Sequence, residues 1–307
     1  MGEAVDTSRM GRVERWTTLD RMPATGLLLV AMLSFQVGGA VGVLLLPGLG
    51  PAGTVAAKNL IGGALLFAVG RPAVRGRSRA AVGWIVFMAV LLTVMNVAFY
   101  VAAARIPIGV AVTISFIGPL TVALVLSRHP RDLAWVALAA AGVALFGGVP
   151  GGAALNKVGL ACAALDAVAW AVYAVTARRV GSVLPGSSAL AFGMLGSALL
   201  LLPFVPAGLA PSHVTPGYAL AIPLLGALTA LPFALEFAAL RRIPAATYGV
   251  LVSLEPALSI GVGALVLSQR PTAVELVAVA LVVTASIGAA RSAGAAVAAD
   301  VGASPDP

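Results

Sequence analysis

The chain has 307 residues, of which 60% are hydrophobic and 10% are charged, and its formal net charge is +8. Soluble domains carry about 25% charged residues, so this composition excludes a protein that faces water on all sides and predicts an all-α, polytopic membrane protein. The positive charge needs no nucleic acid partner, because basic residues at a membrane surface contact anionic lipids.

Ten apolar segments, each about as long as one membrane-spanning helix, follow one another along the chain. Their predicted bounds are 24–46, 52–70, 82–103, 107–127, 132–149, 158–177, 187–205, 217–240, 245–268 and 272–290. Proline, glycine and charged residues separate them, as expected of helix ends. The remaining ends, 1–22 and 292–307, have the composition of disordered tails.

Basic residues are divided unequally between the loops on the two sides of the membrane. With both chain ends in the cytoplasm, fifteen arginines fall on the cytoplasmic side, and only Arg105, Lys157 and Arg270 fall on the outer side. Lys and Arg concentrate in cytoplasmic loops, so this division predicts ten transmembrane helices in the cytoplasmic membrane with both termini cytoplasmic.

Two parts of the chain resemble each other at a constant spacing. The segment FYVAAARIPIGVAVTISFIGP (99–119) aligns with EFAALRRIPAATYGVLVSLEP (236–256) at an offset of 137. The alignment pairs Pro119 with Pro256, and we predict that these prolines bend corresponding helices around a central cavity.

The offset predicts two repeats of five helices, 23–150 and 156–291. Because five is odd, the second repeat must enter the membrane from the opposite side, which agrees with Arg105 outside and Arg242 inside. Inverted repeats are the architecture by which many secondary transporters alternate access to a site near the membrane midplane.

The same phrases resemble a known family. AMLSFQVGGAVGVLLLPGLGPAGTVAA, SFIGPLTVALVLSRHPRDLAWVALAAAGVALF and ALRRIPAATYGVLVSLEPALSIGVGALVLSQR look like the drug/metabolite transporter superfamily with EamA-type domains. Within it they are most similar to the threonine/homoserine exporters, and the resemblance covers about residues 22–291. Two residues depart from the family pattern, because Lys58 stands where an arginine is expected and Asp166 is an additional carboxylate.

The resemblance implies a secondary transporter that exports small amino acids or related metabolites by alternating access. Protons are the expected coupling ion, because acidic side chains are available to titrate. Its partners would be a small-molecule substrate, protons and membrane lipids, and a homodimer is compatible with the sequence. The alternatives are an exporter of drugs or other small metabolites, and a membrane sensor or scaffold that transports nothing.

An enzyme is not expected, and neither is a cofactor or a metal ion. Intramembrane catalysis would need a nucleophile with its base or a metal site, yet His129 and His213 lie in loops predicted on opposite faces. The chain also lacks the GxxxxGK loop that cradles the phosphates of ATP.

Candidate binding residues are the polar side chains inside the apolar segments, because ionisable groups in hydrocarbon are costly and usually face a cavity. Glu236 follows Pro232 by one turn, and this proline, a third predicted bend, leaves the Leu228 carbonyl without its helical donor. We interpret Glu236 as a substrate or proton site; alternatively it pairs with Arg241 or Arg242.

A second acid, Glu255, precedes Pro256 and shares one helical face with Tyr248 and Ser259. This face is too polar for lipid, which again favours a cavity. The alternative is that the Glu255 carboxylate accepts hydrogen bonds from neighbouring helices and merely holds the bend.

A polar stripe is expected on the sixth segment, where Asp166, Trp170 and Tyr173 share a face. An acid beside an aromatic ring suits a solute that bears an ammonium group, through charge and cation–π attraction. The aromatic residues taken alone would more often serve packing.

Further polar candidates lie on the first three segments. Thr93, Asn96 and Tyr100 share a face and would bind the polar groups of a zwitterion, or else form ordinary hydrogen bonds between helices. Lys58 would pair with a buried acid or a substrate carboxylate, or else extend to the outer interface. Gln36 is a weaker candidate of the same kind.

Overall fold

The computed structural model describes residues 22–72, 78–127, 132–146, 155–184, 187–240 and 242–302. These residues form helices joined by turns, with no strand among them, so the predicted all-α fold is confirmed for this part of the chain. The elements are α1 (Ala24–Gly70), α2 (Arg79–Ala103), α3 (Ile108–Ser115), α4 (Ile117–Ser127), α5 (Asp132–Phe146), α6 (Lys157–Val183), α7 (Ser188–Leu201), η3 (Leu202–Phe204), α8 (Val205–Gly208), η4 (Pro211–His213), α9 (Tyr218–Leu240), α10 (Ala245–Val252), α11 (Glu255–Val266) and α12 (Ala273–Gly302).

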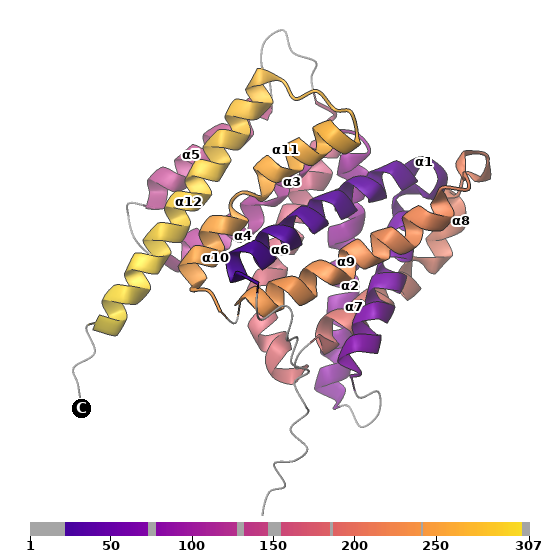
Figure 1. The fold of residues 1–307 in the computed structure, drawn as a ribbon, viewed down its shortest axis with the longest axis horizontal. Coiled ribbons are helices and arrows are strands. Elements are labelled where there is room, and N and C mark those ends of the chain that lie inside the picture. The colour runs from indigo at the N-terminus through magenta and orange to yellow at the C-terminus, as the bar shows by residue number, and fades with distance from the viewer. Residues whose placement is uncertain are drawn as a thin grey trace, which may run out of the picture.

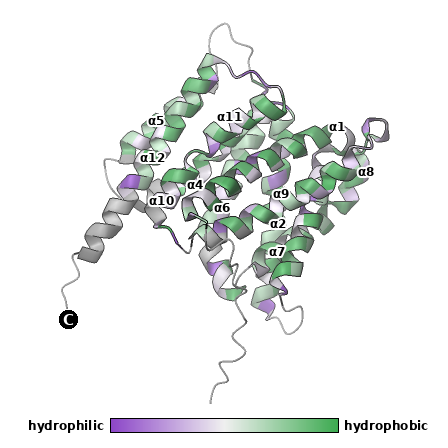
Figure 2. Ribbon diagram, viewed as in Figure 1, coloured by the Kyte–Doolittle hydropathy of each residue, from purple (hydrophilic) through white to green (hydrophobic). Residues whose placement is uncertain are grey.

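Most of the described helices are long and apolar enough to cross a membrane. Six stretches meet both criteria: Ala24–Gly70, Arg79–Ala103, Lys157–Thr176, Ser188–Gly208, Thr247–Val266 and Ala273–Ser292. Three shorter apolar helices accompany them: Ile108–Val122, Leu133–Leu145 and Tyr218–Phe233. Hydrophobic residues run along the helices in Figure 2, and the fold is that of a polytopic membrane protein.

The first two predicted segments are joined in α1, which bends where they were expected to separate. Gly50 has a positive φ of 62°, a conformation that glycine adopts without a steric penalty, between Pro47 and Pro51. The Tyr218 hydroxyl accepts a hydrogen bond from the Gly48 N–H at 3.2 Å. This bond satisfies a backbone group near the bend and ties it to the start of α9.

Helices in the two halves of the chain begin and end at corresponding positions. The bounds of α3 and α10 differ by 137 at both ends, and the last residues of α2 and α9 differ by the same number. Pro107 and Pro244 precede α3 and α10 with similar backbone angles (φ −54°, ψ 140° and φ −61°, ψ 146°). The offset found in the sequence therefore recurs in the backbone.

Each of these short helices is followed by a break and then by a second helix that carries a proline. The breaks fall at Phe116, before Pro119 of α4, and at Ser253 and Leu254, before Pro256 of α11. A proline cannot donate a hydrogen bond to the preceding turn, which favours a break there. Pro232 instead lies within α9, which is continuous from Tyr218 to Leu240, so a bend at Pro232 stays a prediction.

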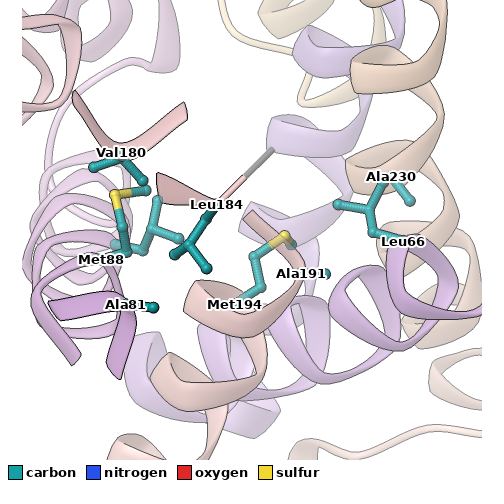
Figure 3. Packing of buried hydrophobic residues seen from close by; sticks show 9 residues of the cluster. Leu66, Ala81, Met88, Val180, Leu184, Ala191, Met194 and Ala230 are labelled. Atoms are coloured by element: carbon teal, nitrogen blue, oxygen red, sulfur yellow. The ribbon is translucent and has the colours of Figure 1, made fainter. Parts of the chain in front are cut away.

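The helices pack in a layered bundle in which α1 contacts α7 and α9, and α2 contacts α6 and α7. Elsewhere α3 packs against α11, while α12 runs beside α5 along one edge of the molecule (Figure 1). Figure 3 shows one of the apolar clusters between helices, formed around Met88, Leu184 and Met194. Such packing holds the polar side chains of α2 and α6 in fixed positions.

The C-terminal end differs from the prediction. A disordered tail was expected from residue 292, whereas α12 continues as helix to Gly302. The extension is rich in alanine, which has the highest helix propensity of all residues. The predicted N-terminal tail, apart from Met22, and residues 303–307 lie outside the described residues.

Candidate functional site

The Lys58 ammonium group lies inside the bundle, between α1 and α2. It donates a hydrogen bond of 2.5 Å to the Asn96 side-chain carbonyl and stands 5.4 Å from the centre of the Tyr100 ring. This distance is within the range of a cation–π interaction. Asn96 in turn donates to the Leu92 carbonyl at 2.7 Å, which fixes the orientation of its amide. The half-buried Lys58 side chain is thus directed toward α2.

A carboxyl group from α6 faces the same region. Asp166 is only 4% exposed, and it interacts electrostatically with Lys58 and with the hydroxyl of Ser115 on α3. Among the described residues, the hydrogen bond of the Lys58 ammonium runs to Asn96 and not to Asp166. A buried carboxylate needs a compensating partner, and here the compensation comes from a hydroxyl and a nearby positive charge.

The other acidic candidates, Glu236 and Glu255, interact with each other near α10. Tyr248 donates a hydrogen bond to the Glu236 carboxylate, and Glu236 interacts electrostatically with Glu255. Tyr173 of α6 interacts with Glu236, and all four side chains are half-buried. Glu255 is the first residue of α11, so it stands directly after the helix break. The sequence had placed it in the middle of a helix.

The polar stripe predicted on α6 extends from the group around Lys58 to the group around Glu236. Asp166 interacts with Lys58, whereas Tyr173, seven residues later, interacts with Glu236. Seven residues of helix rise about 10 Å, which is the separation of the two positions along α6. Trp170 lies between them and packs edge-on against Phe116, with ring centres 5.9 Å apart.

Thr93 and Gln36, two further polar candidates, lie apart from these charged groups in the contacts they make. Thr93 lies 2.8 Å from the Ser197 hydroxyl, which accepts a hydrogen bond from Asn59 at 2.9 Å. This network joins α1, α2 and α7. Thr93 thus forms ordinary hydrogen bonds between helices, which was the alternative to substrate binding. Gln36 is 6% exposed on α1.

Sequence reasoning missed Ser115 and Asn59. Asn59 directly follows Lys58, and Ser115 lies four residues before Pro119 in the aligned segment 99–119, so both positions offered a usable signal. Within the described residues, no three His, Cys, Asp or Glu side chains come close enough to hold a metal ion. Arg241, the first proposed partner of Glu236, lies outside them.

Apolar helices with charged groups buried between them are the features of a multi-pass membrane protein that handles polar solutes. Residues 157–291 match the EamA-like transporter family. The threonine/homoserine exporter RhtA of Escherichia coli K12 is 38% identical over 269 residues, covering 85% of this chain and 89% of the relative. The exporter of the same name in Salmonella typhimurium SL1344 is 36% identical over 268 residues, with the same coverage.

The chain therefore belongs to the drug/metabolite transporter superfamily, in the EamA-like family and on the RhtA-like branch. A solved crystal structure shares the fold, with a TM-score of 0.58 over 92% of this chain and 99% of the other. Its sequence identity is 22%, so it supports the fold alone.

Proposed function

We propose that this protein is a secondary transporter of the cytoplasmic membrane that exports threonine, homoserine or similar small amino acids. The observation that carries the proposal is the presence of charged groups of both signs inside an apolar bundle. Lys58 supplies the positive charge, and Asp166, Glu236 and Glu255 supply the negative charges. Amino acids are zwitterions, so their passage requires groups of both signs away from water. The relatives named as threonine/homoserine exporters support the same substrate class.

The proposed mechanism is alternating access between two inverted five-helix repeats, 23–150 and 156–291. Its support is the spacing of 137 that relates α3 to α10 and the end of α2 to the end of α9. Breaks in corresponding helices give each half a segment at which it can bend. Protons are the proposed coupling ion, because the half-buried carboxylates Glu236 and Glu255 can bind and release them.

Transport by the purified protein tests this function. In proteoliposomes preloaded with unlabelled homoserine, we expect saturable uptake of radiolabelled threonine that excess threonine and homoserine inhibit. A bulky lipophilic cation should inhibit it little, whereas an exporter of drugs would show the reverse order. Liposomes without protein give the background, and flux no higher than this background would favour a sensor or scaffold and contradict the proposal.

The inverted topology is tested by chemical labelling. The single cysteine of the chain, Cys162, is first replaced with alanine. In this background, Arg79→Cys before the third predicted segment should react with a membrane-impermeant maleimide only from the cytoplasmic side. Ser212→Cys, in the exposed η4 segment, should react only from outside. The reason is the concentration of basic residues on the cytoplasmic side. Labelling of both cysteines from one side would rule out the proposed topology.

A further inference from the structure

Lys58 and Asp166 come from the two halves of the chain and attract each other without a direct bond between them. Each group also has a partner of its own. The Lys58 ammonium contacts Asn96 and Tyr100, and the Asp166 carboxyl group interacts with Ser115. In a structural ion pair the two charges are normally in contact, because separated charges in an apolar interior are not fully compensated. Each of these two charges is therefore only partly compensated by the other.

The α-carbon of an amino acid carries the complementary pair of charges. Its carboxylate can accept hydrogen bonds from Lys58, and its ammonium group can donate to Asp166. The face of Trp170, one turn from Asp166 on α6, offers the ammonium a further cation–π contact. A zwitterion placed between the two side chains would thus compensate both charges at once.

The acidic pair at the other end of the stripe has a different character. Glu236 and Glu255 carry the same charge when both are ionised, and the side chains of Tyr173 on α6 and Tyr248 on α10 interact with Glu236. Two groups of the same charge do not complement the opposite charges of a zwitterion. The two groups of an α-amino acid are attached to one carbon atom and cannot span the distance of about 10 Å between the ends of the stripe.

We infer that Lys58 and Asp166 form the subsite for the α-carboxylate and the α-ammonium group of the transported amino acid, and that the Glu236–Glu255 pair lies outside it. The inference rests on the proposed function and assigns to these two residues the discrimination between a zwitterion and a solute with one charge. Asn96 and Ser115 act as positioning residues for the ammonium and the carboxyl group.

Threonine and two analogues that each lack one of its charged groups test the subsite. L-threonine carries both charges, β-hydroxybutyrate lacks the ammonium group, and isopropanolamine lacks the carboxylate. The rise in unfolding temperature that each compound causes in the purified protein gives its apparent affinity, independently of transport. We expect the unmodified protein to bind threonine about tenfold or more tightly than either analogue, as expected for the loss of one charged hydrogen-bond partner.

Removal of one charge from the protein should remove the matching preference. Asp166→Asn should bind threonine and β-hydroxybutyrate with similar affinity, and Lys58→Gln should bind threonine and isopropanolamine with similar affinity. Lys58→Arg, which keeps the charge, should retain the preference for the carboxylate. Glu236→Gln should retain both preferences. The matched control, Glu275→Gln at the start of α12, should behave as the unmodified protein.

Retention of both preferences by Asp166→Asn and Lys58→Gln would overturn the subsite. The melting curve without ligand shows whether each variant is folded, and Asp166→Glu replaces Asp166→Asn if the latter is not; it should retain the preference for the ammonium group. Loss of both preferences in Glu236→Gln would also overturn the inference, because the acids would then form one site. Failure of the unmodified protein to bind threonine or homoserine would instead contradict the proposed function, and the subsite with it.

Discussion

Replacement of Glu255 with glutamine is expected to abolish export driven by a pH gradient while the protein still folds and inserts. Glu255 and Glu236 interact with each other in the interior, and a proton on either one relieves both their repulsion and the cost of a charge held away from water. Binding and release of that proton would couple transport to pH. Glutamine keeps the size and much of the hydrogen bonding of glutamate but cannot take up the proton.

The measurement uses inside-out vesicles, whose lumen corresponds to the outside of the cell. With the unmodified protein, an acidic lumen should drive accumulation of radiolabelled threonine as protons leave. With Glu255→Gln, the rate should fall to that measured without a pH gradient. Glu236→Gln should have a similar or smaller effect, because the Glu236 carboxylate also accepts a hydrogen bond from the Tyr248 hydroxyl. Glu275→Gln, at the surface, serves as the control.

Both glutamine variants would have to be tested before the acids are assigned a structural role. If Glu255→Gln and Glu236→Gln export threonine with unaltered rate and pH dependence, the carboxylates do not couple transport to protons. Their repeat counterparts at the offset of 137 are the uncharged residues Gly118 and Phe99. In the proposed arrangement of two repeats, the two acids are therefore an asymmetric addition, as expected of groups that serve function.

Gly118→Ala is expected to destabilise the protein by about 1–3 kcal/mol, the usual cost of overpacking. A Cβ at this position would stand 2.8 Å from the carbonyl carbon of Ala167 and 3.2 Å from its Cα. The obstacle is backbone, so it cannot be relieved by a change of rotamer and α6 would have to move. Because Asp166 precedes Ala167, the shift should also displace the buried carboxyl group.

Thermal or denaturant unfolding in detergent measures this loss. The control is Gly261→Ala in α11, where a Cβ would meet nothing within 4 Å. Alanine is a better helix former than glycine by up to about 1 kcal/mol, so the control should be neutral or more stable. Equal unfolding midpoints for the two variants would contradict the tight contact between α4 and α6.

Much of this protein is determined by its sequence alone. The low fraction of charged residues dictates the membrane, because such a surface cannot be hydrated on all sides. The offset of 137 was visible in the pairing of Pro119 with Pro256, and proline acts locally through its missing N–H, so the helix breaks near both were foreseeable. The family was identified from the same phrases, and the relatives confirm it.

The partners of the polar residues were decided only by the tertiary structure. Helical periodicity places Asp166, Trp170 and Tyr173 on one face, but it does not say that this face meets Lys58 at one end and Glu236 at the other. In these helices apolar residues lie on most sides of the axis, so the short polar stripes suggest an inward face but do not fix the rotation of each helix. The rotation of each helix follows from close packing with helices distant in the sequence, such as that of Gly118 against the α6 backbone, and these contacts exist only in the folded protein.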